Sequence, residues 1–337
     1  MSRVGIRDVA ELAGVAPSTV SNFFNHPDRV SPDKAQRIRY AIDTLGFVPS
    51  NAGRQLRLGV SQVIGYIAPD VSNPHFAELA NSAEQRALEK GVTVFFANSR
   101  GSRQREDAYI EVFERHQVQG FLVASHLPIE ERLTRARSRG TPSVLIGQRA
   151  RSFEQPSVSV DDVAGGRLAL EHLLRVGCRR IAFVGGPLDT PQVAHRLTGA
   201  TEIARRSGNA TLEVINTSDR SVRGGHEIGE AILSRPPAMR PDGVFTVNDL
   251  LALGVLQAVA MGGIDVPREL AIVGYDDIEF AEASVIPLTS INSSPGDFGS
   301  AAMDLLFKVI DREHPDKPHR VFDPVLVPRA STLAFAR

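Results

Sequence analysis

Residues 6–25 read IRDVAELAGVAPSTVSNFFN, and this stretch predicts two short helices joined by a tight turn at Gly14-Val15-Ala16. Apolar residues recur at helical spacing on one face of each helix, namely Val9, Ala10 and Ala13 in the first and Val20, Phe23 and Phe24 in the second. Pro17 suits the first position of the second helix, where its missing N–H costs nothing. The pattern predicts a helix-turn-helix, although an ordinary αα-hairpin without a binding role would share it.

A third helix should follow these two. Ser31 is suited to be its N-cap, Pro32 fits its first turn, and Gly46 marks its end. Together the helices can bury a small apolar core, for which we expect Val9, Val20, Phe23, Ile38, Ile42, Leu45 and Phe47.

Charge is distributed unevenly along the 337 residues. The whole chain has a net charge of −1, but residues 1–58 hold eight Lys or Arg against five Asp or Glu, which gives +3 there and leaves −4 for the remainder. A small basic unit attached to a mildly acidic body is suited to contact a phosphate backbone at one end only.

Composition restricts the class of protein further. The 42% hydrophobic content is typical of a globular chain, and the length allows two or three compact units. Cys178 is the only cysteine, which excludes internal disulfides and cysteine-based zinc sites. The first residues lack a signal-peptide pattern and no apolar run is long enough to span a bilayer, so we expect a cytoplasmic protein without a membrane partner.

From about residue 62, apolar runs alternate with helical patterns. The expected strands are Val63–Ala68, Val92–Ala97, Gly120–Ala124, Ser143–Ile146, Ile181–Val184, Leu212–Ile215, Gly243–Val247 and Leu270–Gly274. The expected helices include Phe76–Lys90, Gly165–Val176, Val193–Arg206, Asp249–Met261 and Phe298–Asp311. This alternation predicts an α/β fold of parallel sheets covered by helices on both faces, and so many units favour two similar subdomains.

Three motifs carry a resemblance to a known family. They read Ile6-Arg7-Asp8-Val9-Ala10, Ala13-Gly14-Val15 and Ser18-Thr19-Val20-Ser21, and they resemble the headpiece of the LacI/GalR (lactose-repressor) family of bacterial transcription regulators. The resemblance continues in order through the whole chain. It implies an N-terminal all-α helix-turn-helix headpiece followed by a periplasmic-binding-protein-like core of two doubly wound parallel-sheet subdomains.

The resemblance also implies domain boundaries. We expect a DNA-binding headpiece over residues 1–49, a hinge helix or linker over 50–61, and an effector-binding and dimerisation core over 62–337. The N-subdomain of that core should comprise about 62–160 and 293–321, and the C-subdomain about 161–292 and 322–337. Three crossings should join them, near 160–162, 290–293 and 321–323. No leucine heptad follows the last expected strand, residues 325–332, so we expect a homodimer rather than a tetramer.

In this family the second helix enters the major groove of double-stranded DNA. Ser18 and Asn22 lie one turn apart beside Pro17, and they match the family's specificity positions. Asn22 can pair bidentately with adenine, whereas the family more often has an arginine there, suited to guanine. Three short polar side chains, Thr19, Ser21 and Asn25, are placed to bind phosphate, although a solvated helix surface would look the same.

Residues 51–57 resemble the family's hinge helix, of which two lie together in the central minor groove of a pseudo-palindromic operator. Asn51, Gly53 and Leu56 are the expected contacts, and Leu56 matches the leucine that wedges between base steps and kinks the duplex. From the residues alone, the same stretch would be interpreted as a flexible linker whose leucine packs on the core.

Ligands of open parallel sheets bind outside the carboxyl ends of the strands, so polar residues directly after the expected strands are candidates. The candidate effector-binding residues are Asn73, His75, Phe76, Ser125, Arg149, Asp161, Arg196, Arg220, Asn248 and Asp276. Each could instead be a helix cap or a surface charge. The resemblance implies effector contacts for Asp161, Arg196, Asn248 and Asp276. Carboxylates and arginine suit a sugar, because they accept from and donate to vicinal hydroxyls.

Two departures from the family pattern bear on the ligand. Arg220 stands where an aromatic residue is usual, and Gln148-Arg149 replaces a commoner Asp-Arg pair. Both make the cleft less acidic or more basic, so a sugar acid or a phosphorylated sugar is an alternative to a neutral sugar.

An enzyme and a free solute carrier are the competing interpretations. Val184-Gly185-Gly186-Pro187 follows a strand but lacks the G-x-G-x-x-G spacing, and the chain contains no P-loop, G-x-S-x-G elbow or H-E-x-x-H motif. We therefore expect no catalysis, cofactor or metal. A solute-binding carrier would share the cleft but not the basic headpiece. The expected function is effector-controlled transcription regulation, as a repressor.

Overall fold

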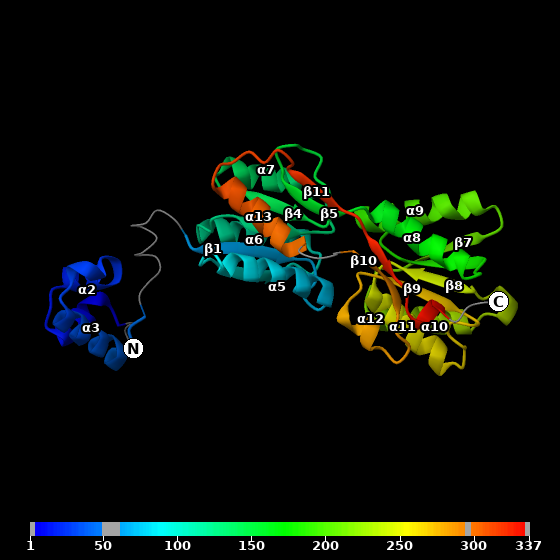
Figure 1. Cartoon of the computed structure of the whole chain (residues 1–337), viewed down its shortest axis with the longest axis horizontal. Coiled ribbons are helices and arrows are strands. Elements are labelled where there is room, and N and C mark those ends of the chain that lie inside the picture. Colours follow the sequence, from blue (N-terminus) through cyan, green and yellow to red (C-terminus); the bar gives the residue numbers. More distant parts are fainter. Residues whose placement is uncertain (1–3, 49–60, 294–297, 334–337) are drawn as a thin grey trace. The chain divides into compact units, whose positions relative to one another are not determined.

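The computed structural model describes residues 4–48, 61–293 and 298–333. The chain forms two compact units, residues 1–61 and residues 62–337 (Figure 1). The expected hinge contacts Asn51, Gly53 and Leu56 lie outside the described residues and stay predictions from sequence. Within the described ranges, no helix is both long and apolar enough to cross a bilayer.

The small unit is built from α1 (Ile6–Ala13), α2 (Pro17–Asn25) and α3 (Pro32–Leu45), with a 3-10 turn at Pro27–Arg29. Gly14 ends α1 with φ +61°, a left-handed conformation that glycine adopts without steric penalty and that turns the chain sharply into α2. Of the expected core residues, Val9, Val20, Ile38 and Phe47 are buried, and Phe23, Ile42 and Leu45 are half-buried against them. The three expected helices and their shared core are confirmed.

The large unit contains two six-stranded sheets, with strand orders β11-β5-β4-β3-β1-β2 and β12-β10-β9-β8-β6-β7. The first consists of β1 (Val63–Ala68), β2 (Thr93–Asn98), β3 (Phe121–Ala124), β4 (Ser143–Ile146), β5 (Ser157–Val160) and β11 (His319–Phe322). The second consists of β6 (Arg180–Gly185), β7 (Thr211–Asn216), β8 (Gly243–Thr246), β9 (Ala271–Tyr275), β10 (Thr289–Asn292) and β12 (Val325–Val327). Neighbouring strands are parallel, except that β12 is antiparallel to β10.

Helices cover both faces of each sheet (Figure 1). On the first sheet, α5 (Pro74–Leu88) and α13 (Phe298–Ile310) pack on one face, and α6 (Arg103–Arg115) and α7 (Glu130–Ser138) pack on the other. On the second sheet, α8 (Asp162–Arg175) and α9 (Pro191–Ser207) form one layer, and α10 (Val222–Leu233) and α11 (Asp249–Met261) form the other. Short segments complete the unit, namely α12 (Glu279–Ala283), α14 (Ala330–Leu333) and a 3-10 turn at Pro237–Met239.

The expected α/β subdomains are confirmed, and each expected strand between residues 62 and 275 is present with bounds that differ by at most one residue. The last expected strand is shorter than predicted: it ends at Val327, because Pro328 cannot donate to a ladder and Ala330 begins α14. The alternation of apolar runs does not reveal α6 and α7, since RQREDAYIEVFER and EERLTRARS consist mainly of charged residues. Cys178 is buried.

Three segments pass from one sheet to the other within the large unit. Two of them lie between β5 and α8 and between β11 and β12, and the third change of sheet follows β10, because the next described helix, α13, packs on the first sheet (Figure 1). Each subdomain is therefore assembled from separate stretches of chain, and the strand ends of both border a common cavity.

Candidate nucleic-acid interface and ligand cleft

The helix α2 presents the residues that are expected to contact DNA. Pro17 and Ser18 are exposed in its first turn, and Asn22 is half-buried one turn later. The expected phosphate ligands Thr19, Ser21 and Asn25 are half-buried as well. Val20 is completely buried and fixes the opposite face of the helix against the core. The geometry thus brings all six candidates together on one short, well-anchored helix.

Two local features modify this surface. Ala16 is the N-cap of α2 and supplies no side-chain hydrogen bond, in contrast to the Ser, Thr, Asp or Asn that this position favours. The side-chain amide of Asn25 donates to the main-chain oxygen of Ser21, so its NH2 group is engaged within the helix. A phosphate contact from Asn25 would therefore compete with its bonds to Ser21 within the helix.

Several arginines of the small unit are exposed. Arg29 is exposed in the 3-10 turn, and the guanidinium of Arg39 lies 5.7 Å from the centroid of the Phe23 ring. Arg37 pairs with Asp33 at 3.7 Å, but both side chains are exposed, and exposed pairs of this kind are weak. These cations stay accessible to a polyanion.

Eight of the ten candidate effector residues line one cavity of about 620 Å³ in the large unit. The first subdomain contributes Asn73, His75, Phe76 and Ser125, and the second contributes Arg196, Arg220, Asn248 and Asp276. Asn73 caps α5 and Asn248 caps α11, each through its side-chain oxygen. Apart from Arg196, which lies in the second turn of α9, the polar residues lie at helix starts and strand ends, as the rule for parallel sheets predicts.

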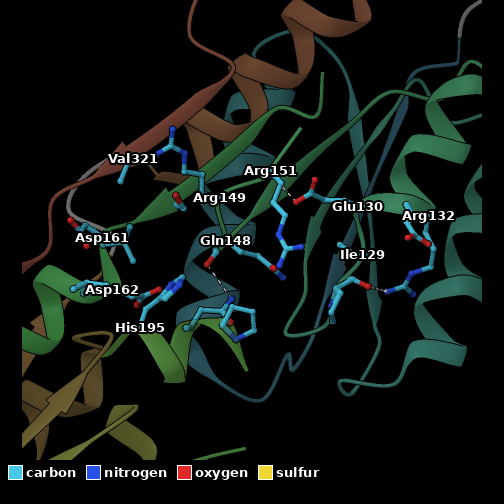
Figure 2. Close-up of a pocket in the computed structure, with 18 of the residues that line it drawn as sticks. Ile129, Glu130, Arg132, Gln148, Arg149, Arg151, Asp161, Asp162, His195 and Val321 are labelled. Atoms are coloured by element: carbon cyan, nitrogen blue, oxygen red, sulfur yellow. Dashed lines mark hydrogen bonds between the residues drawn. The ribbon is translucent and has the colours of Figure 1, made fainter. Parts of the chain in front are cut away.

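The other two candidates, Arg149 and Asp161, line a separate cavity of about 880 Å³ (Figure 2). Asp161 is the N-cap of α8, and its Oδ1 accepts a hydrogen bond of 2.9 Å from the main chain of Ala164. Arg149 is exposed. The two cavities share the lining residues Gly147, Val160 and Gln192, so the ten candidates lie at the same edge of the sheets but are divided between two adjacent cavities.

Arg196 is held rigidly at the cavity. Its Nε lies 2.7 Å from Oδ1 of the buried Asp162, its Nη1 donates to the main-chain oxygen of Val247, and its guanidinium stacks 3.5 Å from the centroid of the Tyr275 ring. The Tyr275 hydroxyl donates to the same Asp162 oxygen at 2.9 Å. Such a group is pre-organised to donate hydrogen bonds to a ligand.

Arg220 has a different environment. It precedes α10 in the second subdomain, and its Nη2 donates to Nδ1 of His126, which follows β3 in the first subdomain, at 2.8 Å. Because arginine has no acceptor, this bond requires a neutral His126 with its proton on Nε2. Burial and the adjacent Arg220 hold the pKa of His126 well below its ordinary value, which agrees with that state.

Asp276 is held in an unusual conformation. It is 8% exposed and has φ +103°, and the following Asp277 has φ +58°; side chains with a Cβ rarely adopt such values. Ser293 donates to Asp276 at 3.4 Å. Strain of this kind persists only where surrounding contacts enforce it, and the neighbouring residues supply those contacts.

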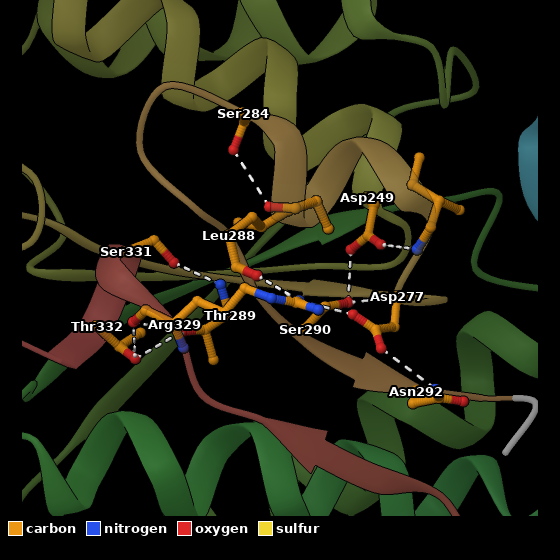
Figure 3. A network of polar contacts seen from close by, with 12 residues as sticks. Asp249, Asp277, Ser284, Leu288, Thr289, Ser290, Asn292, Arg329, Ser331 and Thr332 are labelled. Carbon is orange, nitrogen blue, oxygen red and sulfur yellow. Dashed lines mark hydrogen bonds and ion pairs between the residues drawn. The ribbon is translucent and has the colours of Figure 1, made fainter.

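A buried polar network provides this support (Figure 3). Asp277 accepts from Arg329 at 2.6 Å and from Asn292 at 3.2 Å. Asp249 accepts from Ser290 Oγ at 2.6 Å and from the main chain of Ile278 at 2.9 Å, which ties α11 to the 276–278 loop. Burial and the nearby Asp276 hold the pKa of Asp249 well above its ordinary value.

Ser125 uses its hydroxyl inside its own subdomain. The hydroxyl donates to Glu106 at 2.7 Å and accepts from the main chain of Leu127 at 3.0 Å, and Glu106 forms a buried ion pair with Arg132 at 2.8 Å. Ser125 therefore lines the cavity without a free hydroxyl.

Sequence reasoning missed several lining residues, of which His126 and Gln192 matter most. His126 directly follows Ser125 at the end of a predicted strand, so the same rule could have found it. Gln192 lies in the first turn of α9 and donates across to the main chain of Gly147 at 3.1 Å, a contact between subdomains that has no local signal. Across the described ranges, no group of three or more His, Cys, Asp or Glu is arranged to hold a metal ion.

Comparisons with known proteins agree with both parts of this arrangement. Residues 5–50 match the family model "Bacterial regulatory proteins, lacI family", and residues 170–332 match a periplasmic binding protein-like domain. The ribose operon repressor of Escherichia coli (strain K12) is 32% identical over 330 residues, which cover 97% of this chain and 99% of that protein.

Solved structures show the same fold. The lac repressor dimer bound to operator matches with a TM-score of 0.81 at 24% identity, over 98% of this chain and 99% of that one. A periplasmic binding protein/LacI transcriptional regulator from Alkaliphilus metalliredigens QYMF, complexed with D-xylulofuranose, matches with a TM-score of 0.71 at 27% identity, over 81% of this chain and 99% of that one. The chain belongs to the LacI family of bacterial regulatory proteins, with a DNA-binding helix-turn-helix unit followed by a periplasmic-binding-protein-like body.

Proposed function

We propose that the protein is a transcriptional repressor that binds a pseudo-palindromic operator as a homodimer, and that a sugar or sugar derivative in the cleft controls its affinity for DNA. The observation that carries this proposal is one chain that joins a helix with an exposed polar face to a cavity lined by both α/β subdomains. The ribose operon repressor supports the repressor role, and the operator-bound lac repressor dimer supports the DNA-binding mode.

For DNA recognition, we propose that α2 enters the major groove and that Asn22 and Ser18 read base edges beside Pro17. Thr19, Ser21 and Asn25 would fix the register on phosphates. Selection of bound duplexes from a random pool tests this assignment. Asn22→Arg should change the preferred base at one symmetric pair of positions from adenine to guanine, and an unchanged consensus would remove Asn22 from the recognition surface.

For dimerisation, we propose that the edge strand β2 pairs with a second copy. Phe95 and Phe96 on this strand are 49% and 50% exposed, and an exposed apolar edge strand is a site of association. Two headpieces in one dimer can then read two half-sites of a pseudo-palindrome.

For the effector, we propose a pentose or a pentose derivative as the first class to test. The relatives include a ribose operon repressor and a structure complexed with D-xylulofuranose, and the cavity of about 620 Å³ has the size of a small-molecule site. Since the lining comes from two subdomains, a ligand that contacts both favours one relative orientation of them. The ligand can change the affinity for DNA only if it binds two states of the protein with different affinities. Asn51, Gly53 and Leu56 are the proposed relay in the hinge.

Arg149 and Asp161 remain proposed effector contacts only for a ligand that extends past Gln192 into the second cavity. Asp161→Ala and Asp276→Ala separate the two positions: if the ligand stays in the smaller cavity, only Asp276→Ala should weaken its binding.

The carrier interpretation is not favoured, because the family model covers the helix-turn-helix unit. The relatives are repressors, and from this we infer a regulator without catalytic activity. Measuring the affinity for a selected operator and for a scrambled duplex at increasing salt concentrations distinguishes a regulator from a carrier. A regulator should prefer the operator and lose affinity steeply with salt, whereas a carrier should bind neither.

A further inference from the structure

The cavity contains two arginines with opposite electrostatic situations. Arg196 has a carboxylate partner, Asp162, at 2.7 Å. Arg220 is half-buried, and in the part of the chain that the structure describes its guanidinium is hydrogen-bonded to the neutral ring of His126 and forms no ion pair. Removing a cation from water without a nearby counter-charge costs free energy. A negatively charged partner, which the described part of the protein does not supply, would therefore stabilise the half-buried Arg220.

The nearby carboxylates are engaged elsewhere. Asp219, the residue before Arg220, pairs with Arg223 at 3.1 Å and accepts from the main chain of Ser221 at 3.1 Å. Asp70 accepts from the main chain and the hydroxyl of Ser72, at 2.9 and 2.6 Å. Asp276 receives the Ser293 hydroxyl and acts on Arg220 only at longer range.

The surroundings make the site more favourable to an anion. Burial and the neighbouring Arg196 lower the pKa of Arg220. An added negative charge would raise this pKa and so offset both effects. Asn248 fixes the local main chain by donating to the Arg220 oxygen at 3.0 Å. On the other side, the His126 ring packs against Phe76, with centroids 5.8 Å apart, and Phe76 packs against His75.

We propose that the effector carries a negatively charged group, a carboxylate or a phosphate, that binds Arg220 where it meets His126 at the junction of the two subdomains. The inference rests on the proposed function, because it specifies the ligand of the same cavity. A bound anion would contact one residue of each subdomain, Arg220 and His126. It would therefore favour one relative orientation of the two subdomains and also increase the affinity for the ligand.

The test compares the full-length protein with Arg220→Gln, Arg220→Lys and the control Arg205→Gln, which removes an exposed arginine in the last turn of α9. Thermal unfolding is followed while sodium phosphate or sodium acetate replaces sodium chloride at constant ionic strength. Phosphate stabilises proteins in general by exclusion from their surface, but that effect should be equal in all four proteins. Site binding should appear as an additional rise in Tm in the wild type, in Arg205→Gln and, reduced, in Arg220→Lys.

In Arg220→Gln the additional rise should vanish, because losing a charge-assisted hydrogen bond weakens binding about tenfold or more. A larger response to phosphate than to acetate identifies a phosphorylated ligand, and the reverse identifies a carboxylate. An equal response in the wild type and Arg220→Gln overturns the proposal. The ligand-free Arg220→Gln protein should unfold at the same or a higher temperature, because an unpaired cation is removed; a marked fall would assign Arg220 to the fold instead.

Calorimetry with D-ribose, D-ribonate and D-ribose 5-phosphate extends the test to sugars. The wild type should bind one of the anionic forms at least about tenfold more tightly than ribose, and Arg220→Gln should remove this preference. Tighter binding of ribose than of both anions overturns the proposal, and if none of the three binds, the phosphate and acetate titrations decide. Operator binding is measured separately, so a protein that binds anions at Arg220 but no palindromic DNA would refute only the proposed function.

Discussion

The two subdomains of the large unit share a strand order but support the cavity in different ways. In the first sheet the order is β5-β4-β3-β1-β2, and the corresponding run in the second is β10-β9-β8-β6-β7. The first subdomain contributes aromatic rings, such as Phe76 and His126, together with polar side chains, whereas the second contributes Arg196, Arg220 and Asp276. Similar architecture therefore provides a mixed aromatic and polar wall on one side and a charged, pre-organised wall on the other.

Two buried tyrosines show the same contrast. Tyr66 in β1 and Tyr275 in β9 are both completely buried. The Tyr275 hydroxyl donates to Asp162, but the Tyr66 hydroxyl has no hydrogen-bond partner among the described residues. The second subdomain thus ties its buried tyrosine into the network that holds Arg196, whereas the first leaves the Tyr66 hydroxyl unsatisfied by any described residue.

The largest expected effect comes from breaking the charged wall. Arg196→Met keeps the apolar volume but leaves Asp162, 4% exposed, without its cation, so the free energy of unfolding should fall by about 3–5 kcal/mol. Urea denaturation measures it. Arg167→Met is the matched control, because its pair with Glu202 is exposed on both sides and should contribute far less. Equal losses in both variants would contradict the difference in burial.

The edges of the two sheets give the next comparison. Phe95→Glu on β2 should weaken the proposed dimer by at least about 2 kcal/mol, roughly 30-fold in its dissociation constant, because a carboxylate would be buried at the interface. Val214→Glu on β7, at the edge of the second sheet and 43% exposed, should leave the dimer unchanged. Sedimentation equilibrium distinguishes the two, and a dimer that tolerates Phe95→Glu would place the interface elsewhere.

The tyrosine pair predicts effects of opposite sign. Tyr275→Phe removes a hydrogen bond to a charged acceptor and should destabilise the protein by about 1.5–3 kcal/mol. Tyr66→Phe removes a buried hydroxyl without a partner, so it should be neutral or stabilising by about 1 kcal/mol. Both are measured by denaturant unfolding of the same preparation. A loss of stability in Tyr66→Phe would reveal a partner for that hydroxyl, such as a bound water.

The contrast between local and distant contacts also explains how much could be predicted from sequence. The residues of α2 lie on a single helix, so i, i+4 spacing alone placed Ser18 and Asn22 on its surface and Val20 in the core. The alternation of apolar runs predicted the sheets because buried parallel strands are continuously apolar. The order of the strands depends on contacts between distant segments. The same holds for which of the two cavities Arg149 and Asp161 line. No periodicity encodes the bond between Gln192 and Gly147, nor the one between Arg220 and His126.

The smallest effect concerns His126 and its pH dependence. Burial lowers the pKa of His126 in the folded protein, and the positive charges of Arg220, Arg196 and His75 lower it further. Below pH 6.5 the unfolded chain therefore binds a proton at this residue that the folded chain does not bind. The stability contributed by the neutral ring is therefore present above pH 6.5 and is lost as the pH falls towards the folded-state pKa. One such proton gives a slope of at most about 1.4 kcal/mol per pH unit. The variant His126→Gln can still accept a hydrogen bond from Arg220 but cannot titrate at this position. Its unfolding free energy should decline less steeply between pH 6.5 and 5 than that of the wild type, because the remaining histidines are common to both proteins. Parallel curves for the two proteins would mean that His126 titrates normally and that the Arg220 bond does not hold it neutral.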